Sequence, residues 1–147
     1  MWKAGGEVFM RIRQRVGNVD IHIDTKRIDR NIREAQKLLN IAVRKDCEPL
    51  VPHLNGGLRG SANFPEGIYG GILEYNTSYA HYLYQGELYL ASNGSSWAKK
   101  HEKKYPAGKS LTYHPKGAGT TDHWFDEAKR LHKDEWINAV KDEVGKG

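Results

Sequence analysis

Two stretches near the start of the chain alternate between apolar and polar residues. The apolar positions are Val8, Met10 and Ile12 in the first stretch, and Val19, Ile21 and Ile23 in the second. A period of two predicts β-strands with one apolar face. Gly17 and Asn18 separate the stretches. Both residue types tolerate a positive φ, so we expect a two-residue hairpin turn between the strands.

A helical period follows the second stretch. Apolar residues recur at three- and four-residue spacing, at Ile28, Ile32, Ala35, Leu39 and Ala42. This spacing predicts an amphipathic helix, capped by Asp24 or Thr25, that runs to about Glu48 with its apolar stripe buried. Pro49 and Pro52 end the helix. Its polar side carries basic residues, namely Lys26, Arg30, Arg33, Lys37 and Arg44.

The middle of the chain is rich in turn signals. Residues 53–57 predict a loop, and residues 58–64 and 68–76 predict a second antiparallel pair joined by a turn at residues 65–67. Thr77 or Ser78 can cap a short helix that runs through Tyr84 and ends at Gly86. Residues 87–90 predict one further strand.

Residues 91–109 have the least regular pattern, because they mix Ser, Asn, Gly and Lys with Trp97 and Tyr105. A loop of this length is usually functional or mobile, so we expect an arm that orders against a neighbour. Asp122 caps a last predicted helix, to about Val144. Its expected buried stripe is Phe125, Ala128, Leu131, His132, Trp136, Val140 and Val144.

This order of elements predicts an α+β fold. A mostly antiparallel sheet is packed by a long helix in the N-terminal half and by a C-terminal helix. The 147 residues predict one domain, residues 1–147. No apolar run approaches the roughly 18 residues of a membrane helix, and residues 1–6 lack the apolar stretch of a signal peptide, so we expect a cytoplasmic protein.

The titratable residues restrict the chemistry. Cys47 is the single cysteine, which excludes an internal disulfide and a cysteine-based zinc site, and we expect a buried structural thiol. Four histidines lie in the C-terminal half without the spacing of a helical metal-ligand pair, at His101, His114, His123 and His132. Gly117 and Gly119 resemble a phosphate loop but lack its Lys-Ser/Thr ending. The sequence therefore predicts no enzyme, no metal and no cofactor.

Acidic residues at the start of the last helix have a structural explanation. Asp122, Asp126 and Glu127 could be described as paired carboxylates, but at a helix N-terminus they stabilise the positive end of the dipole. No Ser-His-Asp or Cys-His set has supporting context.

The net charge of +5 allows contact with nucleic acid if the basic residues cluster. Two groups do so in the sequence. Arg11, Arg13 and Arg15 share one strand face with Phe9, and Lys99, Lys100, Lys103 and Lys104 lie in the long loop. Each group is either a DNA-facing surface or a solvated outer face.

Tyrosines crowd one third of the chain, at Tyr69, Tyr75, Tyr79, Tyr82, Tyr84 and Tyr89. Tyr79 and Tyr82 lie three residues apart on the short helix and therefore share a face, whereas Tyr84 points elsewhere. Partly exposed tyrosine supplies large contact area at low entropy cost, which suits an interface. The alternative is a core with a hydrated edge. As subunit or partner contacts we expect Tyr79, Tyr82, Trp97 and Tyr105.

Four segments together carry a family resemblance. They contain Val51-Pro52 with Gly57-Leu58-Arg59, then Tyr79-Ala80 with Tyr82 and Gly86, then Tyr113–Gly119, and lastly Trp124-Phe125 with Ala128-Lys129 and Trp136. In this order, over roughly residues 19–144, they resemble the minor capsid or tail-completion family of tailed bacteriophages. Asn55-Gly56 departs from the family's usual Asp-Thr, and the first predicted strand precedes the family's usual start.

The resemblance implies a non-enzymatic virion subunit. It would form a six- or twelve-fold ring at the head–tail junction, join tail to capsid beside head-closure or tail-terminator subunits, and line the path of the DNA after assembly in the host cytoplasm. The positions expected to support this fold are Pro52, Gly57, Arg59, Gly86, Trp124 and Trp136. Two rival hypotheses are a stand-alone, sequence-independent DNA-binding module and a small enzyme that uses His114 or His123.

Overall fold

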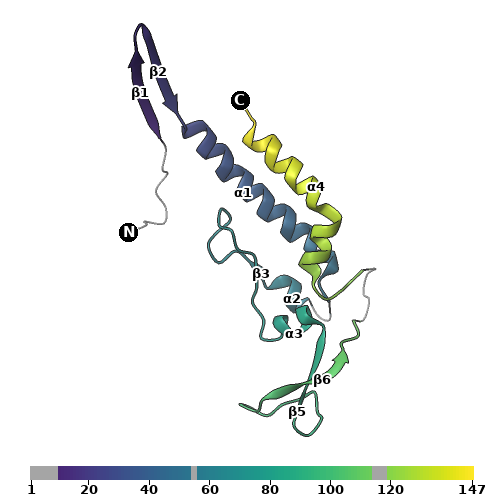
Figure 1. Ribbon diagram of the computed structural model, residues 1–147. Coiled ribbons are helices and arrows are strands. Elements are labelled where there is room, and N and C mark those ends of the chain that lie inside the picture. The colour runs from purple at the N-terminus through teal and green to yellow at the C-terminus, as the bar shows by residue number, and fades with distance from the viewer. Residues whose placement is uncertain (1–9, 54–55, 114–118) are drawn as a thin grey trace.

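A computed structural model describes residues 10–53, 56–113 and 119–147 (Figure 1). The elements are β1 (Arg11–Val16), β2 (Val19–Asp24), α1 (Lys26–Cys47), the 3-10 turn η1 (Glu48–Leu50), α2 (Gly57–Gly60), β3 (Ala62–Asn63), β4 (Glu74–Tyr75), α3 (Ala80–Gln85), β5 (Glu87–Ala91), β6 (Lys104–Ser110) and α4 (Trp124–Val144). Helices and small antiparallel sheets make this an α+β chain, as predicted. No helix in these ranges is long and apolar enough to cross a membrane.

The two long helices, α1 and α4, lie side by side and run antiparallel (Figure 1). Asn31, near the start of α1, donates hydrogen bonds to the carbonyl oxygens of Val144 (3.2 Å) and Lys146 (2.8 Å). These carbonyls lie at the C-terminal end of α4, where a helix leaves acceptors without partners. Near the other end of α1, the indole nitrogen of Trp136 donates to Asp46 at 2.7 Å. The two contacts fix the register of the helix pair.

The core is small and lies where the C-terminal end of α1 meets the first half of α4. It contains Cys47, Leu50, Val51, Leu58, Ala80, Trp124, Ala128 and Trp136. Trp124 is the centre of the aromatic packing, because Tyr75 and Tyr84 approach it edge-on at ring-centroid distances of 5.4 and 4.8 Å. Such edge-to-face pairs contribute about 1 kcal/mol each beyond their buried area.

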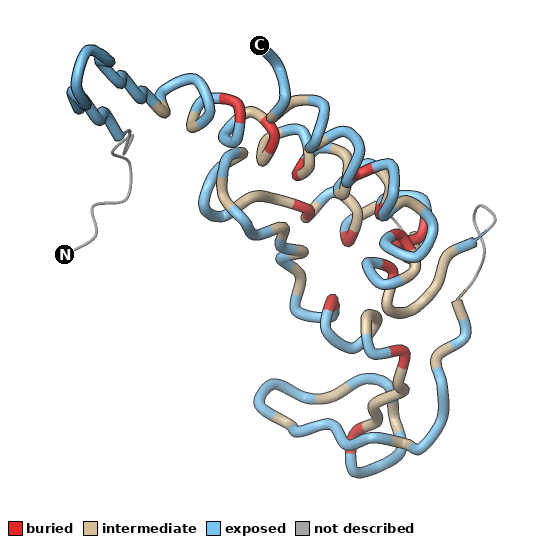
Figure 2. The backbone as a smooth tube through the Cα atoms, turned by 45° about the horizontal axis from the view of Figure 1, so that its top comes forward, coloured by how far each residue is buried: buried red, intermediate tan, exposed pale blue. Residues whose placement is uncertain are grey.

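The predicted buried stripes are only partly buried. On α1, Ile28 and Ile32 are 46% and 51% exposed, whereas Ala35 is 2% exposed. On α4, Phe125 and Leu131 are exposed, whereas Ala128 and Trp136 are buried. The periodicity identified the helices correctly. The burial prediction was wrong at these four positions. Ile28 and Ile32 lie in the part of α1 that extends beyond the core toward the N-terminal hairpin (Figure 2). Phe125 and Leu131 lie on sides of α4 that no described element covers.

The N-terminal hairpin has the predicted turn. The β1–β2 register runs from Arg11 opposite Asp24 to Val16 opposite Val19, so two residues form the turn, and Gly17 adopts φ +61°. The helix start also agrees, because the Asp24 carboxylate accepts a hydrogen bond from the Lys26 amide (2.9 Å). Val8 and Phe9, predicted to extend the first strand, lie outside the described residues.

The antiparallel strands form three separate two-stranded sheets rather than one sheet. The β3–β4 pair has only two residues in each strand, because one helical turn, residues 57–60, replaces the start of the strand predicted at residues 58–64. The predicted turn at residues 65–67 is present, with Gly67 donating to the Phe64 carbonyl at 2.9 Å. In the stretch predicted to be irregular, residues 104–110 form β6 and pair with β5.

Two predicted helix caps are wrong. Tyr79 occupies the N-cap of α3, and the hydroxyl of Thr77 is buried without a hydrogen-bond partner in the described part of the chain. His123, with φ +40°, occupies the N-cap of α4 and donates its backbone N–H to the Tyr84 carbonyl at 2.9 Å. Asp122 makes no cap because its carboxylate lies against Gly86 instead.

Replacing the buried and the exposed position of the α1 stripe tests which side of α1 faces α4. Ala35→Asp should lower the free energy of unfolding by roughly 3 kcal/mol, because it buries a carboxylate without a partner. Ile32→Asp is the matched control and should change it by less than about 1 kcal/mol. Urea denaturation followed by circular dichroism measures both values, and equal losses would contradict the observed helix orientation.

Gly86 tests the junction between α3 and α4. Its φ is +70°, and an added Cβ would lie 2.4 Å from Oδ2 of Asp122. Gly86→Ala should therefore cost about 2 kcal/mol, from backbone strain and the clash together. Gly17 has a similar φ, but a Cβ added there would meet nothing within 4 Å. Gly17→Ala therefore measures the backbone strain without the clash. Adding Asp122→Ala to Gly86→Ala should recover the clash part; no recovery would mean that the two residues do not meet.

Candidate assembly surfaces

A cleft lined by tyrosines lies between α3 and the β5–β6 pair. Its lining includes Tyr79, Tyr82, Tyr89 and Tyr113, and its volume is about 470 Å³; we call it the tyrosine cleft. The left-handed Gly86 ends α3 and turns the chain into β5, which places Tyr82 against Tyr89 at a ring-centroid distance of 4.8 Å. Tyr79 and Tyr82 line the same cleft, whereas Tyr84 packs on Trp124 elsewhere.

The polar groups of the tyrosine cleft are few. The Tyr113 hydroxyl donates to the Leu83 carbonyl. Its burial and, to a smaller extent, the negative charge of the nearby Asp122 raise the pKa of Tyr113 to about 12. This phenol therefore stays protonated near neutral pH and acts as a donor. His53, Glu87 and Lys104 also line the cleft, and the Lys104 ammonium donates to the Ser96 carbonyl at 2.7 Å. An aromatic wall with scattered polar groups suits binding of a protein segment.

A second, larger cleft lies between α1, residues 71–75, α3 and α4; we call it the interhelical cleft. Its volume is about 690 Å³. The lining residues are Gln36, Leu39, Asn40, Val43, Cys47, Gly71, Ile72, Leu73, Tyr75, Ala80, His81, Tyr84, Trp124 and Phe125, with no Asp, Glu, Lys or Arg among them. Ile72 and Phe125 expose 47% and 40% of their surface here. The described side chains of the monomer thus leave an apolar cleft unfilled.

Cys47 lies in the wall of this cleft but is fully buried, as predicted for a structural thiol. Burial, with a smaller effect from Asp46, raises its pKa to about 11. Burial also raises the pKa of Tyr75 above its ordinary value, and that of Tyr84 to about 12. None of these groups is set up as a nucleophile, because a nucleophilic thiol or phenol needs a lowered pKa.

The β1–β2 hairpin is the third surface. One of its faces is apolar and exposed, formed by Ile12, Val16, Val19, Ile21 and Ile23. The opposite face carries the predicted arginines. Arg11 pairs with Asp24 (3.2 Å) and Arg15 with Asp20 (3.8 Å). The pKa of the Asp24 carboxyl is lowered mainly by the hydrogen bond from the Lys26 amide, and to a smaller extent by the charge and hydrogen bond of Arg11. Two of the three arginines therefore already have carboxylate partners.

The predicted basic groups do not form one surface. The exposed loop lysines Lys99, Lys100, Lys103 and Lys104 lie beside β5 and β6, at the opposite end of the molecule from the hairpin (Figure 1). Residues 10–47 contain ten basic and five acidic residues, a net charge of +5 that equals the charge of the whole chain. The excess is thus concentrated in the hairpin and α1, where the polar side of α1 carries Lys26, Arg30, Arg33, Lys37 and Arg44.

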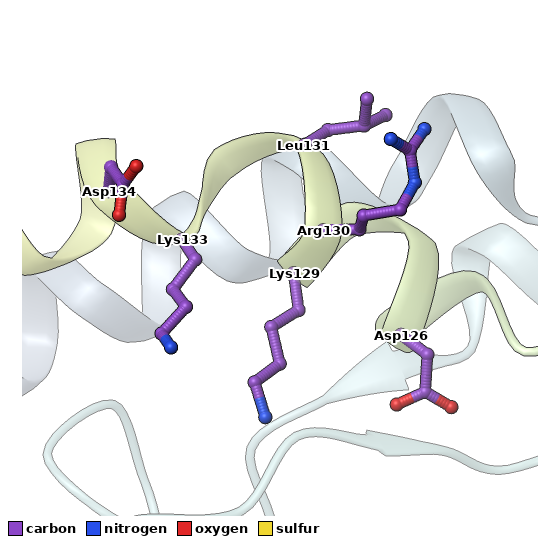
Figure 3. Close-up of a pocket in the computed structure, with 6 residues that line it drawn as sticks. All are labelled: Asp126, Lys129, Arg130, Leu131, Lys133 and Asp134. Atoms are coloured by element: carbon purple, nitrogen blue, oxygen red, sulfur yellow. The ribbon is translucent and has the colours of Figure 1, made fainter.

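The outer face of α4 is a shallow, charged surface with no catalytic arrangement. Lys129 and Lys133 extend side by side from it, and Arg130 points away from both (Figure 3). Arg130 instead binds Glu127 at 2.7 Å, which lowers the pKa of that carboxyl. Asp126 and Asp134 flank the lysines, so the charges of this face nearly cancel.

The remaining predicted positions lie within residues 52–105, from the end of α1 into β6. Trp97 is 86% exposed, and Tyr105 is exposed on β6. Pro52 lines the tyrosine cleft, and Arg59 donates to the Val51 carbonyl at 2.9 Å. Gly57 begins α2 in a helical conformation, and the residue before it, Gly56, has the positive φ (+82°).

The histidines do not converge on one site. His123 packs on Tyr84, His132 pairs with Glu135, and His114 and Gly117 lie outside the described residues. In the described ranges no three His, Cys, Asp or Glu residues gather where they could hold a metal ion.

Sequence reasoning missed the interhelical cleft. Its lining comes from four segments that are far apart in the chain, and none of them shows a local signal. The exposed Ile72 and Phe125 looked like ordinary strand and helix core positions in the sequence. Only the tertiary packing of α1, α4, α3 and residues 71–75 places them at the edge of a cavity.

The burial and high pKa of Cys47 predict slow thiol chemistry. At pH 8 a disulfide reagent such as DTNB should react with Cys47 only when the chain unfolds, because the thiol is neutral and covered while the fold is intact. High urea should unfold the chain, expose the thiol and allow the reaction at once. Trp97→Cys in the Cys47→Ala background is the exposed control and should react immediately without urea. Fast labelling of native Cys47 would show that the cleft wall opens.

Comparisons of this chain with protein-family models, with curated proteins and with solved structures found no match. The resemblance of four ordered segments to a phage family therefore stays a prediction.

Proposed function

We propose that this chain is a non-enzymatic structural subunit of the head–tail connector, or neck, of a tailed bacteriophage. It assembles with copies of itself into a ring, joins the tail to the capsid beside other neck and tail proteins, and lines the path of the genomic DNA. Support comes from the surface of the monomer, from the location of its charge and from the ordered segments that resemble the tail-completion family.

The exposed area is the observation that carries the proposal. The chain exposes 11268 Å², whereas a compact monomer of 16.7 kDa exposes about 7,600 Å². The sixteen residues outside the described ranges are about a tenth of the chain, too few to supply the difference. A chain with this much surface for its mass is typical of a subunit that completes its burial against neighbours.

The surface is also unusually apolar. Nineteen large hydrophobic residues of the described ranges are exposed, whereas the buried hydrophobic core has eleven residues, of which five are alanine. Scattered apolar residues are normal on a monomer, but contiguous patches mark interaction sites. Of the nineteen, five lie on the apolar face of the hairpin and four line the two clefts, namely Ile72, Tyr79, Tyr82 and Phe125. These are surfaces that a ring would cover.

The charge distribution supports a position near DNA. Residues 10–47 hold the whole net charge of +5, and five basic residues lie on one side of α1. Contacts between such a surface and phosphates release counterions and are independent of sequence. The hairpin arginines are the weaker candidates for the DNA path, because Arg11 and Arg15 already pair with Asp24 and Asp20.

The same basic segment favours one alternative, a stand-alone DNA-binding module. That function needs tight, salt-sensitive binding by the isolated monomer, with affinity that falls steeply as salt rises. The neck function needs little affinity before a ring forms. Filter binding of the monomer to double-stranded DNA at low and at physiological salt distinguishes the two, and strong binding by the monomer favours the module.

Replacing Tyr82 tests the assembly function. In a phage that depends on this chain, Tyr82→Ala should leave a folded protein but yield heads and tails that do not join, because it removes half of the Tyr82–Tyr89 pair that lines the tyrosine cleft. Electron microscopy of lysates and infectious titre are the measurements. Tyr69→Ala is the matched control, because Tyr69 is about as exposed as Tyr82 but lines neither cleft. Normal particles with Tyr82→Ala would count against a role of this cleft in joining.

A further inference from the structure

We infer that the β1–β2 hairpin of one copy places its apolar face in the interhelical cleft of a second copy, so that the chain associates head to tail. The inference rests on the part of the proposed function that makes the chain a self-assembling subunit. It adds the two surfaces that meet and the direction in which the assembly grows.

No described element of its own chain covers the hairpin. All twelve strand residues of β1 and β2 are exposed, on both faces. Its apolar face joins cross-strand pairs, with Ile12 opposite Ile23 and Val16 opposite Val19. Isolated two-stranded hairpins are at best marginally stable in water. An uncovered apolar face on such a hairpin therefore indicates that a partner surface stabilises it.

The interhelical cleft has the complementary property. It is a cavity of about 690 Å³ with an uncharged, largely apolar lining, and Ile72 and Phe125 are exposed at it. Apolar groups that leave water contribute about 25 cal/mol for each Å² of buried surface. Filling this cleft with aliphatic side chains from a hairpin removes apolar area from water on both sides of the contact.

A chain's own hairpin does not occupy its own cleft. The hairpin continues away from the N-terminal end of α1 (Figure 1), whereas the cleft residues of α1 lie between Gln36 and Cys47. With a rise of about 1.5 Å per residue, the start of α1 at Lys26 lies roughly 15 Å along the axis from Gln36 and about 30 Å from Cys47. A straight 22-residue helix holds the two surfaces apart, so the occupant is another molecule.

Charge complementarity favours a second copy as that molecule. Two acidic residues follow cleft residues in the chain, Glu74 after Leu73 and Asp126 after Phe125. The Asp126 carboxylate also accepts a hydrogen bond from the cleft residue Tyr84 at 3.3 Å. The incoming segment, residues 10–47, carries the whole net positive charge of the chain. In the described part of the chain Arg13 forms no ion pair, unlike its neighbours Arg11 and Arg15. Because the arginine face lies opposite the apolar face, a hairpin seated in the cleft keeps Arg13 out of the apolar lining and in solvent.

The available area is sufficient. The exposed surface exceeds that of a compact monomer of this mass by about 3,600 Å², and a stable contact needs about 800 Å² from each partner. The hairpin and the cleft are different patches of one molecule, so their contact is heterologous. Heterologous contacts close into a ring when the rotation between subunits permits it, and otherwise grow as a filament.

Disulfide trapping tests the contact directly. Two variants are made in the Cys47→Ala background, Ile21→Cys on the hairpin and Ile72→Cys at the cleft. They are purified separately, mixed and oxidised. The mixture should give a cross-linked heterodimer on a non-reducing gel, and neither variant alone should. Ile21→Cys mixed with Trp97→Cys measures random collision, because Trp97 is the most exposed of the large hydrophobic residues. If the Cys47→Ala background does not fold, the same cysteine variants are made with the native, buried Cys47 retained.

Charge insertion provides the second measurement. Ile21→Asp places a carboxylate on the apolar face and should reduce the mass found by light scattering to that of a monomer. His22→Asp adds the same charge on the opposite face of the same strand and should leave the assembly intact. Circular dichroism checks that both variants keep the monomer fold.

Each outcome decides the inference. A disulfide formed by Ile21→Cys alone means that hairpins pack on each other in a dimer, and cross-linking no greater than the Trp97 control means that the cleft takes no hairpin from a second copy; either result overturns the inference. An unchanged mass for Ile21→Asp does so as well. If the mixed cysteine variants form the disulfide but phage carrying Ile21→Asp has a normal titre, the head-to-tail contact is supported and the neck function is refuted.

Discussion

The antiparallel contact of α1 with α4 is the constraint on which the rest of the structure depends. Asn31 binds carbonyls at the end of α4, and Asp46 accepts the Trp136 indole hydrogen bond. Ala35 on α1 and Ala128 on α4 are both buried, and side chains this small allow packed helices to approach closely. The remaining elements of the core attach to this pair, around Trp124.

A core of this size leaves much of the chain outside it. The hairpin extends beyond one end of the helix pair and the β5–β6 unit beyond the other (Figure 2). Because side chains from the short middle elements do not fill the space beside α1 and α4, the interhelical cleft remains open to solvent. The same geometry that makes the monomer extended therefore creates both a projecting apolar segment and a place to receive one.

The electrostatics follow the same division. The hairpin and α1 form a basic segment, whereas residues 48–147, which include α4, carry equal numbers of basic and acidic residues. Charges within each region are partly neutralised by near neighbours, such as Arg130 with Glu127 and Arg11 with Asp24. Exposed pairs of this kind contribute at most about 1 kcal/mol each. Their effect is on which partners approach, and the fold depends on packing instead.

Local sequence signals determined much of this protein. The Gly17-Asn18 turn, the two long helices, the β5 strand and the end of α3 at Gly86 were predicted correctly, because each depends on backbone preferences or on a periodicity that neighbouring residues set. The buried thiol of Cys47 was also predicted from its place on the inner side of a helix.

Tertiary structure alone decided which parts of those elements are covered. The stripe of α1 has helical periodicity along its whole length, but burial depends on whether another element lies opposite, so Ala35 is buried and Ile32 is exposed. Asp122 lost its expected cap role because it meets Gly86, a residue 36 positions away in the chain. The strand β6 formed in an irregular stretch because β5 supplied its hydrogen-bond partners. Contacts between distant segments have no signature in local sequence, and for that physical reason the two clefts were beyond prediction.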